Sequence, residues 1–175
     1  AWNVLIYRYT SQTDIITGTP VAGREHADLE EQIGFYVNTL ALRNKIDPEE
    51  DFNTFYRTLK DNTLKSYNHQ MYPFDRLVEE LNLQRDTSRS AVFDVLLTLQ
   101  NNSENKELDH PDTYQAVIGL NEITDLGPSV SKFDIDITFQ EKGNCLSLEV
   151  IYNPDVYEKK MVEGLIKHYK QLLNA

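Results

Sequence analysis

The feature that most constrains this chain is a strict alternation of apolar and polar side chains late in the sequence. Residues 133–140 alternate at every position, and residues 146–150 alternate again after a short polar segment that contains a glycine. A period of two places every second side chain on the same face of a β-strand. Two such runs predict an antiparallel hairpin with one buried and one solvated face. We place Asp134 and Asp136 on the solvated face, as surface residues rather than paired catalytic carboxylates.

The remaining patterns predict more strands and helices around this hairpin. Apolar and β-branched runs predict strands at residues 14–18, 36–43 and 91–99. Helical spacing or capping residues predict helices at residues 1–9 and 26–33, and helices that begin at Asp47, at Pro73 and at 153–155. The polar stretch 101–131 is too long for a simple connection, so it is either a functional excursion or a mobile loop. The fold class is therefore α/β in the broad sense, an α+β arrangement of a mixed sheet with flanking helices.

Capping residues and apolar stripes locate two of these helices more closely. Asp47 is expected to cap its helix, with Pro48 in the first turn and Glu50 completing a capping box. The apolar stripe of that helix comprises Phe52, Phe55, Tyr56, Leu59 and Tyr67. The final helix is expected to bury Met161, Leu165, Tyr169 and Leu172.

Length and charge exclude several classes of partner. The 175 residues predict one domain, or one lobe of something larger. With 17 Lys and Arg against 28 Asp and Glu, the net charge of −11 argues against nucleic acid, which requires clustered basic residues. No apolar run is long enough to cross a bilayer, so we expect no membrane. The single cysteine, Cys145, excludes an internal disulfide and fits a cytoplasmic location.

Local motifs for catalysis are weak. Residues 18–25 approach a phosphate-binding loop, but Arg24 replaces the lysine and Glu25 the hydroxyl residue that would hold magnesium. The four histidines, at 26, 69, 110 and 168, include no pair with metal-ligand spacing, so we expect no metal site. No Gly-x-Ser-x-Gly nucleophile elbow is present. These signals alone predict no catalytic residue in this chain.

Four longer motifs carry more information. They are Ile-Ile-Thr-Gly-Thr-Pro-Val-Ala-Gly-Arg (15–24), Ile-Gly-Phe-Tyr-Val-Asn-Thr-Leu-Ala-Leu-Arg (33–43), His-Gln-Met-Tyr-Pro-Phe-Asp (69–75) and Arg-Asp-Thr-Ser-Arg-Ser-Ala-Val-Phe (85–93). In order and spacing they resemble the later motifs of condensation domains of nonribosomal peptide synthetases. The resemblance extends over essentially all of the chain. It implies one lobe of a fold similar to chloramphenicol acetyltransferase, in which two lobes enclose an active-site tunnel.

The resemblance also implies what the chain does not contain. The family carries an HHxxxDG motif in its N-terminal lobe, and the second histidine of that motif is catalytic. No two histidines are adjacent here, so residues 1–175 are similar to the C-terminal lobe alone, and we expect this lobe to be inactive by itself. The partners implied are the N-terminal lobe, donor and acceptor carrier proteins, and an adjacent adenylation domain. Phosphopantetheine arms of the carriers would bring aminoacyl or peptidyl thioesters for amide bond formation, and no cofactor would bind this lobe directly.

Residue roles follow from the resemblance as expectations. Asn38 is the first candidate for a tunnel residue, because an amide can hydrogen-bond a tethered substrate without adding charge; the alternative is that it only ties its strand to neighbouring backbone. The other expected tunnel residues are Gly34, Tyr36, Thr39, Gln70 and Tyr72. Residues expected to anchor loops or the lobe junction are Arg24, Arg85, Asp86, Ser88 and Arg89. For Arg24, contact with a carrier phosphate is the alternative.

Two departures from the family pattern leave the subtype open. Met71 stands where the family has an acidic residue, and Ala91-Val92 stands where it has Pro-Leu. Epimerisation and heterocyclisation domains share this lobe architecture and remain alternatives, because the residues that separate them lie upstream. A carrier-binding module without chemistry is the third alternative.

Overall fold

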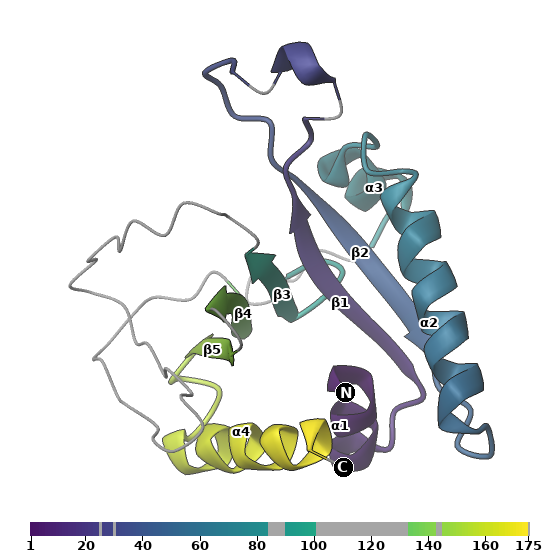
Figure 1. Cartoon of the computed structure of the whole chain (residues 1–175), viewed down its shortest axis with the longest axis vertical. Helices are drawn as coiled ribbons and strands as arrows, with labels where there is room; N and C mark the ends of the chain where they lie inside the picture. The colour runs from purple at the N-terminus through teal and green to yellow at the C-terminus, as the bar shows by residue number, and fades with distance from the viewer. Residues whose placement is uncertain (25, 30, 84–89, 101–132, 143–144, 175) are drawn as a thin grey trace.

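A single mixed sheet organises the chain in the computed structural model, which describes residues 1–24, 26–29, 31–83, 90–100, 133–142 and 145–174 (Figure 1). Within these residues the strand order is β2-β1-β3-β4-β5. The strands are β1 (Asp14–Val21), β2 (Asn38–Lys45), β3 (Val95–Gln100), β4 (Ile135–Lys142) and β5 (Cys145–Tyr152). The helices are α1 (Trp2–Thr10), α2 (Phe52–Tyr67), α3 (Phe74–Glu80) and α4 (Lys159–Leu173), with one 3₁₀ turn at Ala27–Leu29. The predicted mixed sheet with flanking helices is confirmed.

The sheet combines two antiparallel hairpins across a parallel centre. β1 pairs with β2 from Asp14↔Lys45 to Val21↔Asn38, and β4 pairs with β5 from Ile135↔Tyr152 to Lys142↔Cys145. β3 lies between the hairpins and runs parallel to both β1 and β4. The pairing of β4 with β5 confirms the hairpin predicted from strict alternation. As expected from that alternation, β4 buries Ile135, Ile137 and Phe139 on one face.

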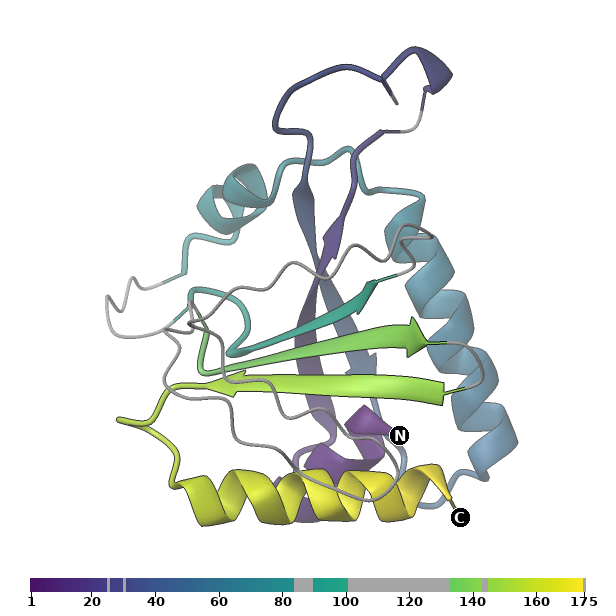
Figure 2. The ribbon, with the colours of Figure 1, turned by 60° about the vertical axis from the view of Figure 1, so that its left-hand side comes forward.

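The main core lies between the β4–β5 hairpin and helices α1 and α4. Figure 2 shows α4 running along the edge of the sheet with α1 behind it. The apolar side chains that meet there include Leu5, which is 2% exposed, and Trp2, Ile137, Val150, Leu165 and Tyr169. Trp2 and Tyr169 make an edge contact with ring centroids 6.2 Å apart. None of the helices in the described part of the chain is long and apolar enough to span a membrane.

The β1–β2 pair forms an arm that carries the functional motifs away from this core. In Figure 2 its two strands run across the direction of β3, β4 and β5, and in both views the segment that joins them projects beyond the body of the molecule (Figures 1 and 2). Helix α2 packs along β2 and buries Phe55. The arm and α3 meet where β2 begins, and the candidate site lies at that junction.

Several predicted helix boundaries were wrong for identifiable reasons. The helix expected at 26–33 is only the 3₁₀ turn Ala27–Leu29, because Ile33 has no core to pack against and is fully exposed. Asp51, rather than Asp47, caps α2 by accepting hydrogen bonds from the N–H groups of Asn53 and Thr54. The strand expected at 91–99 begins later, at Val95.

The C-terminal helix also differs from expectation. Residues 153–155 form a turn, and α4 begins at Lys159 after Glu158. Leu165 and Tyr169 are buried as predicted, but Met161 is 47% exposed, and Val162 and Ile166 complete the buried face of the helix. The connection at 101–131 lies outside the described residues.

Candidate functional site

The side chain of Asn38 makes three hydrogen bonds at the junction of the arm and α3. Its Nδ2 donates to the backbone carbonyls of Gln70 at 2.7 Å and Tyr72 at 2.8 Å. Its Oδ1 accepts a hydrogen bond from the backbone N–H of Phe74 at 3.2 Å. An amide has two donor hydrogens and one carbonyl oxygen, so both ends of the side chain are engaged. The geometry therefore favours the structural alternative, in which Asn38 ties β2 to the turn before α3.

The residues of that turn are held by further contacts. Tyr72 lies beside Glu80 at the end of α3, and its hydrogen bond to the Glu80 carboxylate raises the pKa of the Tyr72 hydroxyl. The backbone carbonyl of Gln70 accepts from Asn38. Thr39, next in β2, is half-buried and pairs with Pro20 of β1. The structure thus brings Asn38, Thr39, Gln70 and Tyr72 to one place, although they come from two separate motifs.

Arg24 organises the loop at the end of the arm. Its guanidinium donates to the carbonyls of Leu29 and of Gly34, the latter at 3.3 Å, and lies 4.4 Å from the centroid of the Tyr36 ring. The Tyr36 hydroxyl in turn donates to Oε1 of Gln32 at 2.7 Å. These contacts support the loop-anchoring role of Arg24. Residues 18–21 belong to β1, which removes the resemblance of this segment to a phosphate-binding loop.

One glycine fixes the shape of this loop. Gly23 has a φ of +62°, and a Cβ at this position would collide with the carbonyl oxygen of Tyr36. Both the left-handed backbone and the close approach require a residue without a side chain. Gly23 just after β1 and the contacts of Arg24 with Leu29 and Gly34 therefore constrain the described part of this loop.

The second half of this loop presents apolar side chains to solvent. Ile33 is 104% exposed, Phe35 is 90% exposed and Val37 is 49% exposed. Single exposed apolar residues are ordinary on protein surfaces, but a contiguous group on a projecting loop marks an interaction site. The sequence placed Gly34 and Tyr36 in a tunnel wall without identifying these three neighbours.

Metal and histidine chemistry has no support in the part of the chain that is described. No group of three His, Cys, Asp or Glu side chains that could hold a metal ion occurs among these residues. His26 lies 3.3 Å from Asp28 on the exposed loop, and His168 Nδ1 lies 2.6 Å from the Tyr9 hydroxyl. Of the predicted junction residues, Arg85, Asp86, Ser88 and Arg89 lie outside the described residues.

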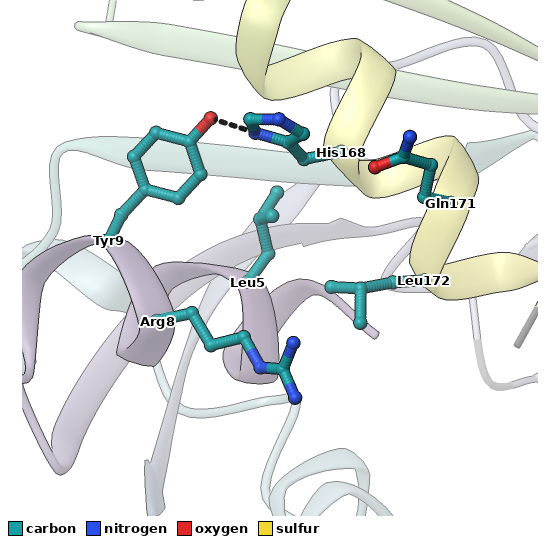
Figure 3. Close-up of a pocket in the computed structure, with 6 residues that line it drawn as sticks. All are labelled: Leu5, Arg8, Tyr9, His168, Gln171 and Leu172. Atoms are coloured by element: carbon teal, nitrogen blue, oxygen red, sulfur yellow. Dashed lines mark hydrogen bonds between the residues drawn. The ribbon is translucent and has the colours of Figure 1, made fainter.

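A hollow that the sequence patterns did not indicate opens between α1 and α4 (Figure 3). Its volume is about 660 Å³, and it is lined by Leu5, Arg8, Tyr9, His168, Gln171 and Leu172. Because these residues come from opposite ends of the sequence, no local motif could have revealed them.

Comparison with known proteins gives the class of this fold. The sequence profile of the condensation domain family matches residues 1–175. The chain belongs to the condensation domain family.

Relatives and solved structures agree with this assignment. The chain is 40% identical to tyrocidine synthase 3 of Brevibacillus parabrevis over 99% of its own length and 3% of that protein. It is 39% identical to gramicidin S synthase 2 of Brevibacillus brevis over its full length and 4% of that protein. The chain thus spans a small part of the curated relatives it matches.

Two solved structures show the same fold. A four-domain nonribosomal peptide synthetase matches with a TM-score of 0.77 at 23% identity, over 94% of this chain and 13% of that one. The condensation domain of the monacolin K polyketide synthase MokA matches with a TM-score of 0.73 at 19% identity, over 98% of this chain and 38% of that one.

Proposed function

We propose that residues 1–175 form the C-terminal lobe of a nonribosomal peptide synthetase condensation domain, and that the assembled domain makes amide bonds. The observation that carries the proposal is the family match along the whole chain, together with relatives that are tyrocidine and gramicidin synthases. The chain covers only 38% of the solved MokA condensation domain chain, which supports the assignment to one lobe.

The reaction joins two thioester-linked groups. The acceptor amine nitrogen attacks the donor thioester carbonyl, a C–N bond forms, the C–S bond breaks, and a proton passes from nitrogen to the departing thiolate. The substrates arrive on phosphopantetheine arms of donor and acceptor carrier proteins, with an adjacent adenylation domain supplying activated amino acids in the cytoplasm. A histidine of the N-terminal lobe orients or deprotonates the amine, and this chain supplies no catalytic residue.

The role of this lobe is to form one wall of the tunnel. Asn38 fixes the Gln70–Tyr72 turn against β2 through its three hydrogen bonds, and Thr39, Gly34 and Tyr36 extend the same wall. A preorganised wall holds the two tethered groups close together, and such positioning lowers the barrier of a reaction between two bound groups. The apolar tip residues Ile33 and Phe35 support a second lobe, because their exposed side chains need a partner to bury them.

Reconstitution tests the proposal. The chain alone, mixed with loaded donor and acceptor carriers, is expected to give no amide above the uncatalysed background. Addition of the N-terminal lobe from the same synthetase is expected to restore amide formation, measured by mass spectrometry of the acceptor arm. A variant with Ile33→Ser and Phe35→Ser is expected to need a higher concentration of that lobe. The matched control, Leu64→Ser, changes an exposed apolar residue of α2 and is expected to behave as wild type.

The same assay separates the alternatives. A change in donor stereochemistry without an amide would indicate an epimerisation domain, and an amide that loses water would indicate heterocyclisation. Carrier binding without any product from the two lobes would indicate a module without chemistry. Amide formed by the chain alone would contradict its assignment to an inactive lobe.

A further inference from the structure

The hollow between α1 and α4 lies at the opposite end of the molecule from the projecting loop that carries Ile33 and Phe35. Figure 3 shows that Tyr9, Arg8 and Leu5 reach it from α1, and His168, Gln171 and Leu172 reach it from α4. Leu5 is almost fully buried and forms an apolar floor, whereas Arg8, Tyr9, His168 and Gln171 are exposed. A volume of about 660 Å³ falls in the range of small-molecule sites, which are about 300–1,000 Å³.

Two polar side chains around this hollow have N–H donors that no other described residue engages. The Tyr9 hydroxyl lies 2.6 Å from His168 Nδ1, so these two side chains are hydrogen-bonded to each other. The Arg8 guanidinium and the Gln171 amide make no hydrogen bond or ion pair with the described residues. Two groups that can donate to an anion, the Arg8 guanidinium and the Gln171 amide, therefore lie at the rim of an apolar floor.

Charge along the chain favours an anion at this place. α1 and α4 contain five Lys and Arg residues and one acidic residue, Glu163, which gives the two helices a formal charge of +4. Since the whole chain carries −11, the remaining residues carry −15. None of the residues that line the hollow is acidic. Arg8 is the one lining residue with a permanent charge. Its single positive charge would neutralise the single negative charge of a monoanion.

We propose that the α1–α4 hollow is a binding site for a carboxylate carried on an apolar chain. The carboxylate lies against Arg8 and the Gln171 amide, because a guanidinium and an amide both present N–H donors to carboxylate oxygens. The apolar chain packs on Leu5, Leu172 and the Tyr9 ring. This chemistry has two sources, a free amphipathic carboxylate or a Glu side chain beside apolar residues of a partner protein. The site is independent of the proposed amide-forming activity.

Titration of the full 175-residue chain with sodium octanoate, followed by ¹H–¹⁵N spectra, tests the proposal. We expect saturable shifts at the amides of Arg8, Tyr9, His168 and Gln171. Octanamide, which has the same chain without the charge, is expected to bind about fivefold more weakly, the factor of an exposed charge pair. Shifts elsewhere, or equal binding of octanoate and octanamide, would overturn the proposal.

Two variants check that the charge acts locally. Arg8→Gln is expected to weaken octanoate binding about fivefold. Lys160→Gln removes the same charge from α4 about two turns before His168 and is expected to leave binding unchanged. If both variants lost the same octanoate affinity, the effect would come from the net charge of the chain rather than from Arg8, and this result would contradict the proposed site.

A pair of blocked peptides identifies the source of the carboxylate. We compare Gly-Leu-Glu-Leu-Gly with Gly-Leu-Gln-Leu-Gly, each acetylated and amidated. Competition by the Glu peptide alone supports a partner protein as the source, and binding of octanoate without competition supports a free amphiphile. Failure of both octanoate and the Glu peptide to bind would refute the site.

Discussion

The Oδ1 atom of Asn38 accepts a hydrogen bond from the backbone N–H of Phe74 at 3.2 Å, which joins the first residue of β2 to the first residue of α3. The N-cap residue of α3 is Pro73, whose side chain makes no capping hydrogen bond. The first N–H groups of a helix have no partner within the helix. Asn38 therefore supplies, from 36 residues away in sequence, an acceptor that a local cap would normally provide.

Replacement of Asn38 tests whether this amide is structural. Asn38→Ala removes three hydrogen bonds to backbone groups and is expected to lower the free energy of unfolding by about 2 kcal/mol, measured by urea denaturation. Asn53→Ala, at an exposed amide of α2, is the matched control and is expected to stay within about 0.5 kcal/mol of wild type. Unchanged stability with lost amide formation in the reconstituted domain would instead assign Asn38 to the substrate.

Gly18 and Phe93 define a second tight contact in the sheet. A Cβ on Gly18 would collide with the Phe93 ring, which also packs against Phe74 at 5.6 Å and Phe133 at 5.2 Å between centroids. Gly18→Ala is expected to destabilise the chain by about 2 kcal/mol, since a well-packed core does not accommodate an added methyl group. Combination with Phe93→Leu is expected to cost less than the sum of the single changes, by about 1 kcal/mol. Strict additivity in urea denaturation would show that the two residues are not in contact.

A glycine in α4 gives the opposite prediction. No atom lies within 4 Å of the Cβ that Gly164→Ala would add, and the residue lies inside a regular helix. Alanine restricts the unfolded chain and favours the helix, so the variant is expected to be more stable by about 0.5–1 kcal/mol. Thermal unfolding by circular dichroism measures the change, and a lower midpoint would contradict the placement of this position in an open part of α4.

Local sequence patterns correctly predicted those helices and strands in which the apolar residues of the repeating pattern are also the buried residues. The β4–β5 hairpin is one example, because Ile135, Ile137 and Phe139 alternate with polar residues and all three are buried. The helix expected at 26–33 failed because helical spacing is not sufficient without a surface to cover Ile33. For α2, both Asp47 and Asp51 accept backbone N–H bonds, so the sequence alone did not decide between them.

The candidate site was only partly predictable for a different reason. The motifs named Asn38, Gln70 and Tyr72 together, and the three residues are neighbours in the structure, but the hydrogen bonds that join them link residues more than 30 positions apart. The family resemblance identified these residues, but their hydrogen-bond partners are visible only in the folded structure. The α1–α4 hollow had no local signature at all, since Tyr9 and His168 are 159 residues apart.

Two carboxylates are expected to affect stability with opposite dependence on pH. Asp136 was predicted on a fully solvated face, but it is half-buried between Leu96 of β3 and Ile151 of β5 in the sheet register. Burial raises its pKa above 3.8, and no hydrogen bond from the described residues offsets that cost. Asp14, in contrast, accepts two hydrogen bonds from Arg43, at 2.8 and 2.6 Å, and these hold the pKa of Asp14 below 3.8.

Proton linkage gives the direction in which each carboxylate changes stability with pH. Because the folded-state pKa of Asp136 is raised, the charged carboxylate destabilises the fold at neutral pH, and the penalty disappears as pH falls through that pKa toward 3.8. Asp136→Asn is therefore expected to be more stable than wild type at pH 7, with the difference vanishing below pH 3.8. Asp14→Asn is expected to be less stable at pH 7, with its difference vanishing only as pH falls below the lowered pKa of Asp14. Urea midpoints for the three proteins from pH 3 to pH 7 measure both trends, and parallel pH profiles for the two variants would contradict the burial of Asp136.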